Sequence, residues 1–376
     1  MATVAVGGPQ AVSRVGRFFQ PVAGRPLDRL PENRILLGRW QTAAETGEEL
    51  IVCRRETTVE IHCHGGHAAA QVVIESLASA GCQVLPWQQV LAKTGQDPIT
   101  IEATRALAQA VTQRTAAILL DQRQGALRRA LDQIARCLAA GDAATAGPML
   151  EQLLQAARWG PYLIRPFRVV ICGLPNAGKS SLINALAGYP RALVSQLPGT
   201  TRDVLTARIA LDGWSVELAD TAGLRKPSDP IEWAGIEQAQ AHGSYADLVV
   251  LVFDRSRAWS EQAERVYRNF PDALVTHNKI DLPGSGIGNR PEGILTSALS
   301  GQGIDRLAAA ILRRLVPRPP GPREAIPFTR RQGELLAQTK EAVEHRRFAT
   351  ATDRLRRIYA REPLHADEHE VFENPP

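Results

Sequence analysis

The spacing of hydrophobic and polar positions divides this chain into three kinds of segment. Residues 1–95 alternate strand-like runs, RILLGRW and TTVEIHCH, with a helix-like run, AAAQVVIESLASAGCQVL. This mixture of periods predicts a small α+β domain. Residues 96–165 carry few strand formers, and their apolar positions fall at helical spacing, most clearly at Leu127, Leu131, Ile134 and Leu138. That spacing predicts amphipathic helices.

An alternation of strands and helices begins at PFRVVICG and extends over residues 166–317. Four β-branched runs, WSVELAD, ADLVVLVFD, ALVTHNKID and GILTSA, each precede a loop and then a helix. This order is typical of a doubly wound, mostly parallel sheet. The proline-rich VPRPPGPREAIP follows as a linker, and residues 318–376 return to helical spacing, with apolar positions at Leu336, Val343, Leu355 and Ile358. We therefore predict an α/β domain inserted in a helical domain, after an N-terminal α+β domain.

Composition narrows the functional classes. Of the 376 residues 44% are hydrophobic, which is enough for two or three domain cores. The longest apolar run is far shorter than a membrane span, and the N-terminus lacks the layout of a signal peptide, so we expect a cytoplasmic protein with no membrane partner. Five cysteines form no C-x-x-C pair, which favours neither a disulfide framework nor a zinc ribbon. The net charge of +5 permits contact with nucleic acid but does not demonstrate it.

The stretch GLPNAGKSSLINALAG carries the first candidate chemistry. It contains G-x-x-x-x-G-K-S between the strand-like FRVVICG and a helix-like run, the context in which backbone N–H groups surround a nucleotide phosphate. We expect Lys179 to reach the β- and γ-phosphates and the Ser180 hydroxyl to coordinate Mg²⁺. The predicted nucleotide-binding residues of this loop are Asn176, Ala177, Gly178, Lys179, Ser180 and Ser181.

A second motif, DTAG, stands at the end of the predicted strand WSVELA. This position directs the Asp220 carboxylate toward the Mg²⁺ shell, and the N–H of Gly223 can approach the γ-phosphate because no side chain blocks it. The predicted nucleotide-binding residues of this motif are Asp220, Thr221, Ala222 and Gly223.

NKID ends another predicted strand and provides Asn278, Lys279 and Asp281. The Asp281 carboxylate can accept hydrogen bonds from both the N1–H and the 2-amino group of guanine, whereas adenine offers neither. A site of this design rejects the wrong base by roughly 10⁴ or more. TSALSG follows with Ser297 and Ala298, where backbone N–H groups would contact the guanine O6. Four motifs in this order predict GTP binding.

The catalytic apparatus is harder to derive from these motifs. In Ras-type sites a glutamine directly after the DxxG glycine orients the attacking water, but here that position is Leu224. An aliphatic side chain cannot orient water. Another group must therefore assist catalysis, or the protein hydrolyses GTP very slowly.

Four motifs, PNAGKSSLINALAG, PGTTRDV, DTAGLR and NKID, closely resemble the G domain of the MnmE (TrmE) family of tRNA-modification GTPases. VEIHCHGG resembles the family's N-terminal folate-binding domain, and helices on either side of an inserted G domain match its architecture. The resemblance implies modification of the tRNA wobble uridine together with an FAD-dependent partner. It also implies a homodimer formed through the N-terminal and G domains.

The same resemblance offers a substitute for the missing glutamine. In this family K⁺ beside the phosphates supplies the positive charge that an arginine gives elsewhere, and its implied ligands here are Asn176, Ser195, Leu197 and Thr200. Thr201 matches the second Mg²⁺ ligand, and Glu232 matches the glutamate that positions the water, so Glu232 and Lys179 are the catalytic candidates. The alternatives are a turn-forming asparagine for Asn176 and an exposed charge at a helix start for Glu232.

The sequence also departs from the family pattern. Ala5 stands where the family has an arginine that contacts folate, and no counterpart of its lysine-containing block occurs between Val90 and Thr104, although Glu60 is kept. The family's terminal C-x-G-K has no match in this sequence, which ends HEVFENPP. We therefore expect weak or absent binding of 5-formyltetrahydrofolate.

Three functional hypotheses follow from these motifs. The first is an MnmE-type GTPase in tRNA modification, which the G-domain motifs favour. The second is a ribosome-assembly GTPase of the Era or Der kind, against which stand the single G domain and the absence of a KH-type GxxG in the tail. The third is a GTP-dependent dimerisation switch without the tRNA role, which Ala5 and the missing C-x-G-K favour.

Overall fold

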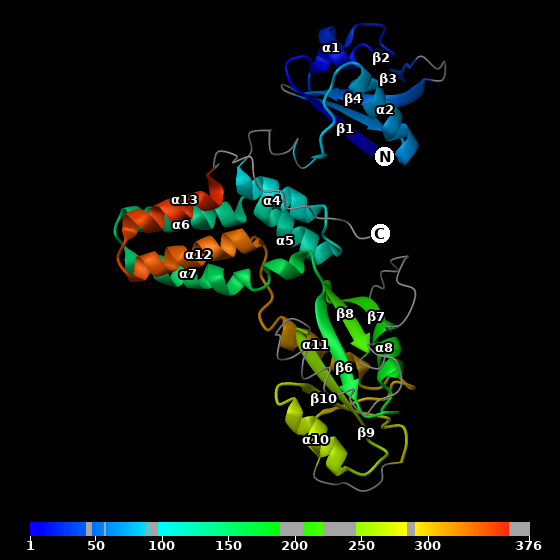
Figure 1. Cartoon of the computed structure of the whole chain (residues 1–376), viewed down its shortest axis with the longest axis vertical. Coiled ribbons are helices and arrows are strands. Elements are labelled where there is room, and N and C mark those ends of the chain that lie inside the picture. Colours follow the sequence, from blue (N-terminus) through cyan, green and yellow to red (C-terminus); the bar gives the residue numbers. More distant parts are fainter. Residues whose placement is uncertain are drawn as a thin grey trace. The chain divides into compact units, whose positions relative to one another are not determined.

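The computed structural model describes residues 1–42, 47–55, 58–87, 89, 97–188, 206–220, 246–283 and 290–360. Inter-residue contacts divide the chain into two compact units, Met1–Gln96 and Asp97–Pro376, and each has hydrophobic cores of its own. Figure 1 shows the N-terminal unit in blue and the second unit in cyan to red. No described helix is long and apolar enough to cross a membrane.

The N-terminal unit is an antiparallel sheet with helices, as the alternating pattern predicted. Its strands, in the order β1-β5-β4-β3-β2, are β1 (Ala2–Gly7), β5 (Thr58–Cys63), β4 (Glu48–Arg54), β3 (Ile35–Trp40) and β2 (Phe19–Pro21). The helices are α1 (Ala11–Val15), the short η1 (Leu27–Arg29) and α2 (His67–Ser79). Every second side chain of β5, namely Val59, Ile61 and Cys63, is buried, because successive strand residues face opposite sides of a sheet.

Helix α2 is shorter than its apolar run. The run extends to Leu85, but the helix ends at Ser79, and Gly81 takes a left-handed conformation with φ of 85°. Its N–H donates to the carbonyl of Ala78, and the N–H of Cys82 donates to the carbonyl of Leu77. Glycine ends the helix here because it adopts this conformation without steric cost.

Helices from both sides of the G-domain segment pack together, as Figure 1 shows for α6 beside α13 and α7 beside α12. They are α4 (Pro98–Leu107), α5 (Gln113–Arg123), α6 (Ala126–Ala139), α7 (Ala143–Ala157), α12 (Arg330–Glu344) and α13 (Phe348–Tyr359). Both predicted apolar stripes are buried in one shared core. The first helix begins where Asp97 accepts hydrogen bonds from the backbone N–H groups of Ile99 and Thr100. The exact residue boundaries of the four predicted domains remain predictions.

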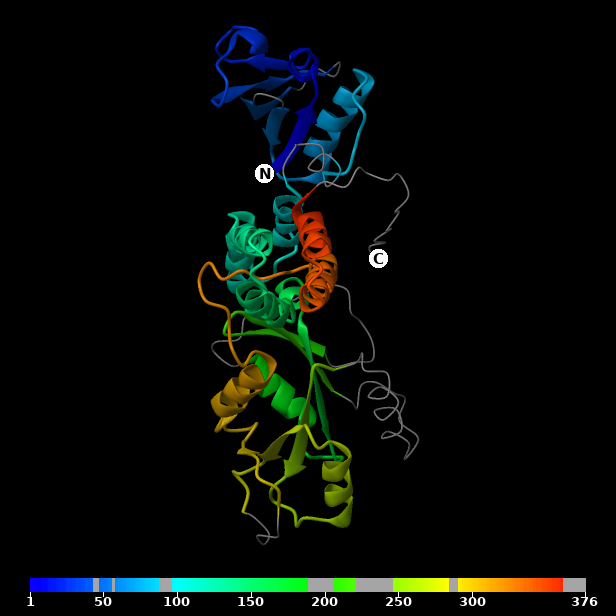
Figure 2. The same cartoon turned by 90° about the vertical axis from the view of Figure 1, so that its left-hand side faces the viewer.

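The α/β part contains a six-stranded sheet, which confirms the predicted fold class. Its strands, in the order β11-β10-β9-β6-β8-β7, are β11 (Ile294–Leu295), β10 (Leu274–Asn278), β9 (Leu248–Asp254), β6 (Phe167–Gly173), β8 (Trp214–Asp220) and β7 (Thr206–Leu211). All described pairings are parallel except that of β7 with β8. Two helices, α8 (Lys179–Ala187) and α11 (Ile304–Leu315), share a core with one face of the sheet, and α10 (Glu261–Asn269) shares one with the other. Figure 2 shows the second unit from the side.

A short segment connects the helices to the first strand of this sheet. In the 3₁₀ helix η2 (Gly160–Leu163), the ring of Tyr162 stacks on Phe167 with 3.8 Å between centroids. The Tyr162 hydroxyl donates a hydrogen bond to Oδ1 of Asp247, and Oδ2 of Asp247 accepts the N–H of Arg168 at 2.7 Å. This tyrosine therefore links the segment that enters the sheet to the start of β9.

We expect Tyr162→Phe to lower the free energy of unfolding by about 1–2 kcal/mol at pH 7, because a hydrogen bond to a carboxylate is lost. Burial, followed by the hydrogen bond to Asp247, raises the pKa of Tyr162 to about 12. This raised pKa makes the stabilisation complete below the unfolded-state pKa of about 10. It is lost as pH rises from there through about 12.

Denaturant unfolding of the unmutated protein and of Tyr162→Phe between pH 7 and pH 12 would measure the difference in their free energies of unfolding. This difference should narrow above pH 10. Tyr267→Phe on α10 is the matched control, because the structure shows no partner for that hydroxyl among the described residues. An equal loss in both variants at pH 7 would contradict a specific role for the Tyr162 contact.

Candidate functional site

The loop between β6 and α8 is shaped by two glycines. A Cβ atom on Gly173 would lie 2.2 Å from the carbonyl oxygen of Val252 on the neighbouring strand. Gly178 has a φ of 91°, and a Cβ there would lie 2.4 Å from Nδ2 of Asn278. Neither position accepts a side chain without displacing its neighbours. These constraints hold the loop close to the sheet, with α8 beginning directly after it.

Lys179 and Ser180 open α8 and point into the loop region. The Lys179 ammonium donates to the carbonyl oxygens of Gly173 and Leu174 at 3.1 and 3.3 Å, which places its charge over the loop. The Ser180 hydroxyl donates to Oδ2 of Asp220 at 2.7 Å. Asp220 ends β8 and is buried. The structure thus brings together the hydroxyl and carboxylate that were predicted to serve Mg²⁺, and both are oxygen donors of the kind this ion prefers.

The Asn278 side chain connects three separate loops. It lies at the end of β10 with 1% of its surface exposed. Its Nδ2 donates to the carbonyl of Ala177 at 3.1 Å, and its Oδ1 accepts the N–H of Ala298 at 3.0 Å and the hydroxyl of Thr296 at 3.4 Å. One buried amide therefore joins the phosphate loop, the NKID segment and the TSALSG segment.

Lys279 takes a left-handed backbone conformation, with a φ of 66°, and points back toward the phosphate loop. Its ammonium donates to the carbonyl of Asn176 at 2.6 Å and to Oδ2 of Asp254 at 2.8 Å. Burial alone would raise the pKa of Asp254, but hydrogen bonds from Lys279 and Ser256 outweigh it, and the pKa lies below its usual value. Asp254 is therefore an anion, and its carboxylate holds the Lys279 ammonium against the loop.

Asp254 was not predicted from the sequence. It ends β9, next to β10 in the sheet, and its Oδ1 also accepts the N–H and the hydroxyl of Ser256. The sequence did contain a signal for this residue, because Asp254 ends a predicted parallel strand. The carboxyl ends of neighbouring parallel strands lie at the same edge of the sheet, so a carboxylate there lies near the other site residues.

The remaining predicted residues of the NKID and TSALSG motifs have different surroundings. Asp281 is exposed, two positions after Lys279. Ser297 is buried, and its hydroxyl accepts the N–H of Ser300 at 3.1 Å within its own loop. The N–H of Ala298, predicted to reach guanine O6, here donates to Asn278. Direct contacts of these residues with a nucleotide remain predictions.

Ser181, a further predicted nucleotide-binding residue, is exposed in the first turn of α8. Nine residues that the sequence analysis discussed lie outside the described part of the chain, namely Ser195, Leu197, Thr200, Thr201, Thr221, Ala222, Gly223, Leu224 and Glu232. Their predicted roles therefore rest on the sequence.

Comparisons with known proteins cover the G-domain segment and, for two relatives, most of the chain. A sequence model of the family described as 50S ribosome-binding GTPase matches residues 168–279. The tRNA modification GTPase MnmE of Synechococcus sp. (strain RCC307) is 34% identical over 357 aligned positions, which cover 83% of this chain and 77% of that protein. The tRNA modification GTPase MnmE of Prochlorococcus marinus (strain MIT 9313) is 32% identical, and the alignment covers 92% of this chain and 86% of that protein. The solved G domain of the T. maritima FeoB iron transporter is 26% identical with a TM-score of 0.30, and covers 40% of this chain and 99% of its own.

We expect Asn278→Ala to lower the free energy of unfolding by about 2–4 kcal/mol, because the buried carbonyl of Ala177 and the N–H of Ala298 lose their partner. Asp281→Ala, three positions later and exposed, should change it by less than about 0.5 kcal/mol. Urea unfolding of both variants measures the contrast. Equal stability losses would show that the Asn278 amide does not hold the loops together.

Proposed function

This chain belongs to the tRNA modification GTPase MnmE family, and we propose that it hydrolyses GTP to GDP and phosphate in the modification of tRNA. The observation that carries the proposal is the junction at Asn278, where one buried side chain bonds to the phosphate loop and to the TSALSG loop. The segments that we propose to bind phosphate and base are thereby joined through one side chain.

The phosphate end of the site has the groups that GTP hydrolysis needs. Lys179 would bind the β- and γ-phosphates, for which its ammonium already lies over the loop. Ser180 and Asp220 would hold Mg²⁺, which offsets the negative charge on the phosphates. Asn278 bonds to the loop carbonyl of Ala177, and Lys279, which Asp254 holds, bonds to that of Asn176. These bonds would reduce the reorganisation that the loop needs when the nucleotide binds.

For the reaction itself, we propose the K⁺-assisted mechanism that family membership suggests. Asn176 would supply one K⁺ ligand, and its backbone carbonyl is held by Lys279, which supports a fixed position for this residue. The further ligands would be Ser195, Leu197 and Thr200, with Thr201 at the Mg²⁺ and Glu232 positioning the water. The cation would stabilise negative charge that develops on the phosphates.

The proposed partners are tRNA, a second copy of this chain and an FAD-dependent tRNA-modifying protein. A second candidate function is a GTP-dependent dimerisation switch without tRNA modification. One observation favours it: Ala5 on β1 lies opposite Glu60 on β5, so a methyl group stands where the family has a guanidinium for folate. The Glu60 carboxylate is instead paired with Arg55 at 3.3 Å. We expect weak or absent binding of 5-formyltetrahydrofolate.

We expect Asp281→Asn to weaken GTP binding on the order of a hundredfold or more, because the carboxylate loses its two hydrogen bonds to guanine. The variant should gain affinity for xanthosine triphosphate, whose base offers an oxygen where guanine has its amino group. Calorimetric titration with GTP, ATP and xanthosine triphosphate measures these affinities, and Asp272→Asn, another exposed aspartate, is the control. Equal affinity of the unmutated protein for ATP and GTP would overturn the GTP assignment.

Phosphate release should be severalfold faster in KCl than in NaCl at equal ionic strength if a K⁺ site assists the reaction. Glu232→Ala should lower turnover by about 10²-fold with nearly unchanged nucleotide affinity, since the glutamate acts on water and not on the nucleotide. Glu261→Ala, an exposed glutamate at the start of α10, is the matched control. Identical rates in both salts would remove the cation mechanism, and normal turnover of Glu232→Ala would make this residue a surface charge.

A further inference from the structure

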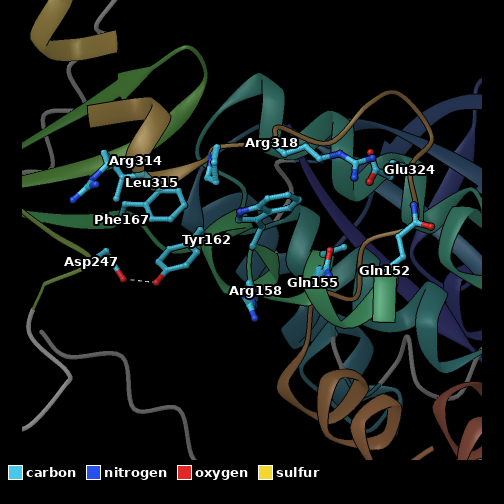
Figure 3. A pocket seen from close by; sticks show the side chains of 13 residues that line it. Gln152, Gln155, Arg158, Tyr162, Phe167, Asp247, Arg314, Leu315, Arg318 and Glu324 are labelled. Carbon is cyan, nitrogen blue, oxygen red and sulfur yellow. Dashed lines mark hydrogen bonds between the residues drawn. The ribbon is translucent and has the colours of Figure 1, made fainter. Parts of the chain in front are cut away.

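A cavity of about 510 Å³ lies where the α/β part joins the helices. Its lining comes from the end of α7, from η2 and the start of β6, from the residue before β9, and from the end of α11 with the segment that follows it. Figure 3 shows Tyr162 and Asp247 at one side, with Arg314 near them and Arg158 and Arg318 farther along. The segment that leads from the helices into the sheet forms one wall of this cavity, and the segment that leads from the sheet back to the helices forms another.

The cavity carries more positive than negative charge. Three arginines line it, Arg158, Arg314 and Arg318, and all three are exposed. In the described residues no hydrogen bond or ion pair engages the guanidinium groups of Arg158 and Arg318, while Arg314 donates to the carbonyl of Asp272. These charges are therefore available to an anionic ligand.

The two acidic residues of the lining are already engaged. Asp247 accepts the hydroxyl of Tyr162 and the N–H of Arg168 through its two oxygens. Oε2 of Glu324 accepts the N–H of Gly321 at 2.8 Å. Neither carboxylate is paired with an arginine of the cavity within the described part of the chain.

The cavity also provides planar and hydrogen-bonding groups. Trp159 is half-buried in the lining, and its neighbour Tyr162 is covered by its stacking partner Phe167. Gln152 and Gln155 add exposed amides from α7. A flat aromatic ring beside guanidinium groups is the combination that binds single-stranded nucleic acid, with a base stacked on the ring and phosphates on the arginines.

Arginines at the start of α12, which do not line the cavity, have different surroundings. Arg331 on α12 donates to Oε1 of Glu102 at 2.9 Å and to the carbonyls of Arg357 and Ile358. Arg330 is paired with Glu334 at 2.6 Å. These side chains stabilise the helices, whereas those of Arg158 and Arg318 have no such role in the described structure.

We propose that this cavity binds a single-stranded segment of RNA, with one base against Trp159 and the phosphates on either side of it bound by Arg158 and Arg318. This assignment rests on the proposed role in tRNA modification and gives tRNA a contact surface apart from the GTP site. An RNA strand fits better than a free nucleotide, because the arginines come from two separate segments, the end of α7 and the stretch from Arg314 to Arg318, and are spread along the cavity. RNA bound there would contact both segments that connect the helices to the sheet.

The test measures binding of a fluorescent tRNA transcript to the full-length chain by anisotropy at several KCl concentrations. Arg158→Gln combined with Arg318→Gln should weaken binding about tenfold and reduce the slope of log affinity against log salt by about two, one for each lost phosphate contact. The matched control is Arg136→Gln combined with Arg306→Gln, two exposed arginines that do not line the cavity. It should bind almost as the unmutated protein does.

Trp159→Leu separates stacking from charge. It should weaken tRNA binding roughly fivefold or more without changing the salt slope, because a base loses its stacking surface and no phosphate contact is removed. Unfolding midpoints of all variants show whether the fold is kept. GTP titration in parallel reports on the nucleotide site.

Four outcomes would overturn the proposal. If the unmutated protein binds tRNA and the double variant binds equally well, the cavity is not the RNA site and the tRNA role stands. If the control variant with Arg136→Gln and Arg306→Gln loses as much affinity for tRNA as the double variant of the cavity, the loss comes from the lower net charge and not from the cavity. If GTP titration shows a second bound nucleotide that the double variant lacks, the cavity binds free nucleotides. If the unmutated protein binds no tRNA, both this inference and the tRNA role fail, although the GTPase assignment is unaffected.

Discussion

The candidate site depends on the parallel register of four strands. Strands β8, β6, β9 and β10 lie side by side, and their carboxyl ends meet at one edge of the sheet. The register pairs Ile171 with Asp220 and Asp254 with Asn278. Parallel alignment therefore brings together side chains that lie up to about a hundred positions apart in the sequence, which no local structure could do.

Three polar side chains at this edge are each held by a hydrogen-bond partner. Asn278, Asp254 and Asp220 are largely shielded from water, and each makes at least one hydrogen bond to a neighbouring loop or helix. A buried polar atom without a partner would cost about 1–3 kcal/mol, so the network favours one arrangement of the loops. The absence of a side chain on Gly178 is part of that arrangement, since Asn278 occupies the space.

The helices around the α/β part form one core from two distant segments of the chain. Gln332, buried on α12, accepts the N–H of Phe328 and donates to Glu102 on α4, so the two segments are joined by polar contacts as well as by apolar packing. The apolar stripes of α6 and α13 are buried in the same core, which α7 and α12 share. The α/β part can therefore lie between two helical segments in sequence without interrupting their packing.

Periodicity and motifs were sufficient to predict the α+β unit, the helices and the parallel sheet, because these depend on short-range patterns that repeat within ten or so residues. The phosphate loop and the placement of Ser180 and Asp220 toward one Mg²⁺ site were predicted as well, since their motifs combine a residue type with a strand end, whereas the direct hydrogen bond between the two came from the structure. Asp254, the bond between Ala298 and Asn278, and the cavity at Trp159 came only from the tertiary structure. Each joins residues from separate elements, and only the packing of the strands and helices decides which side chains meet.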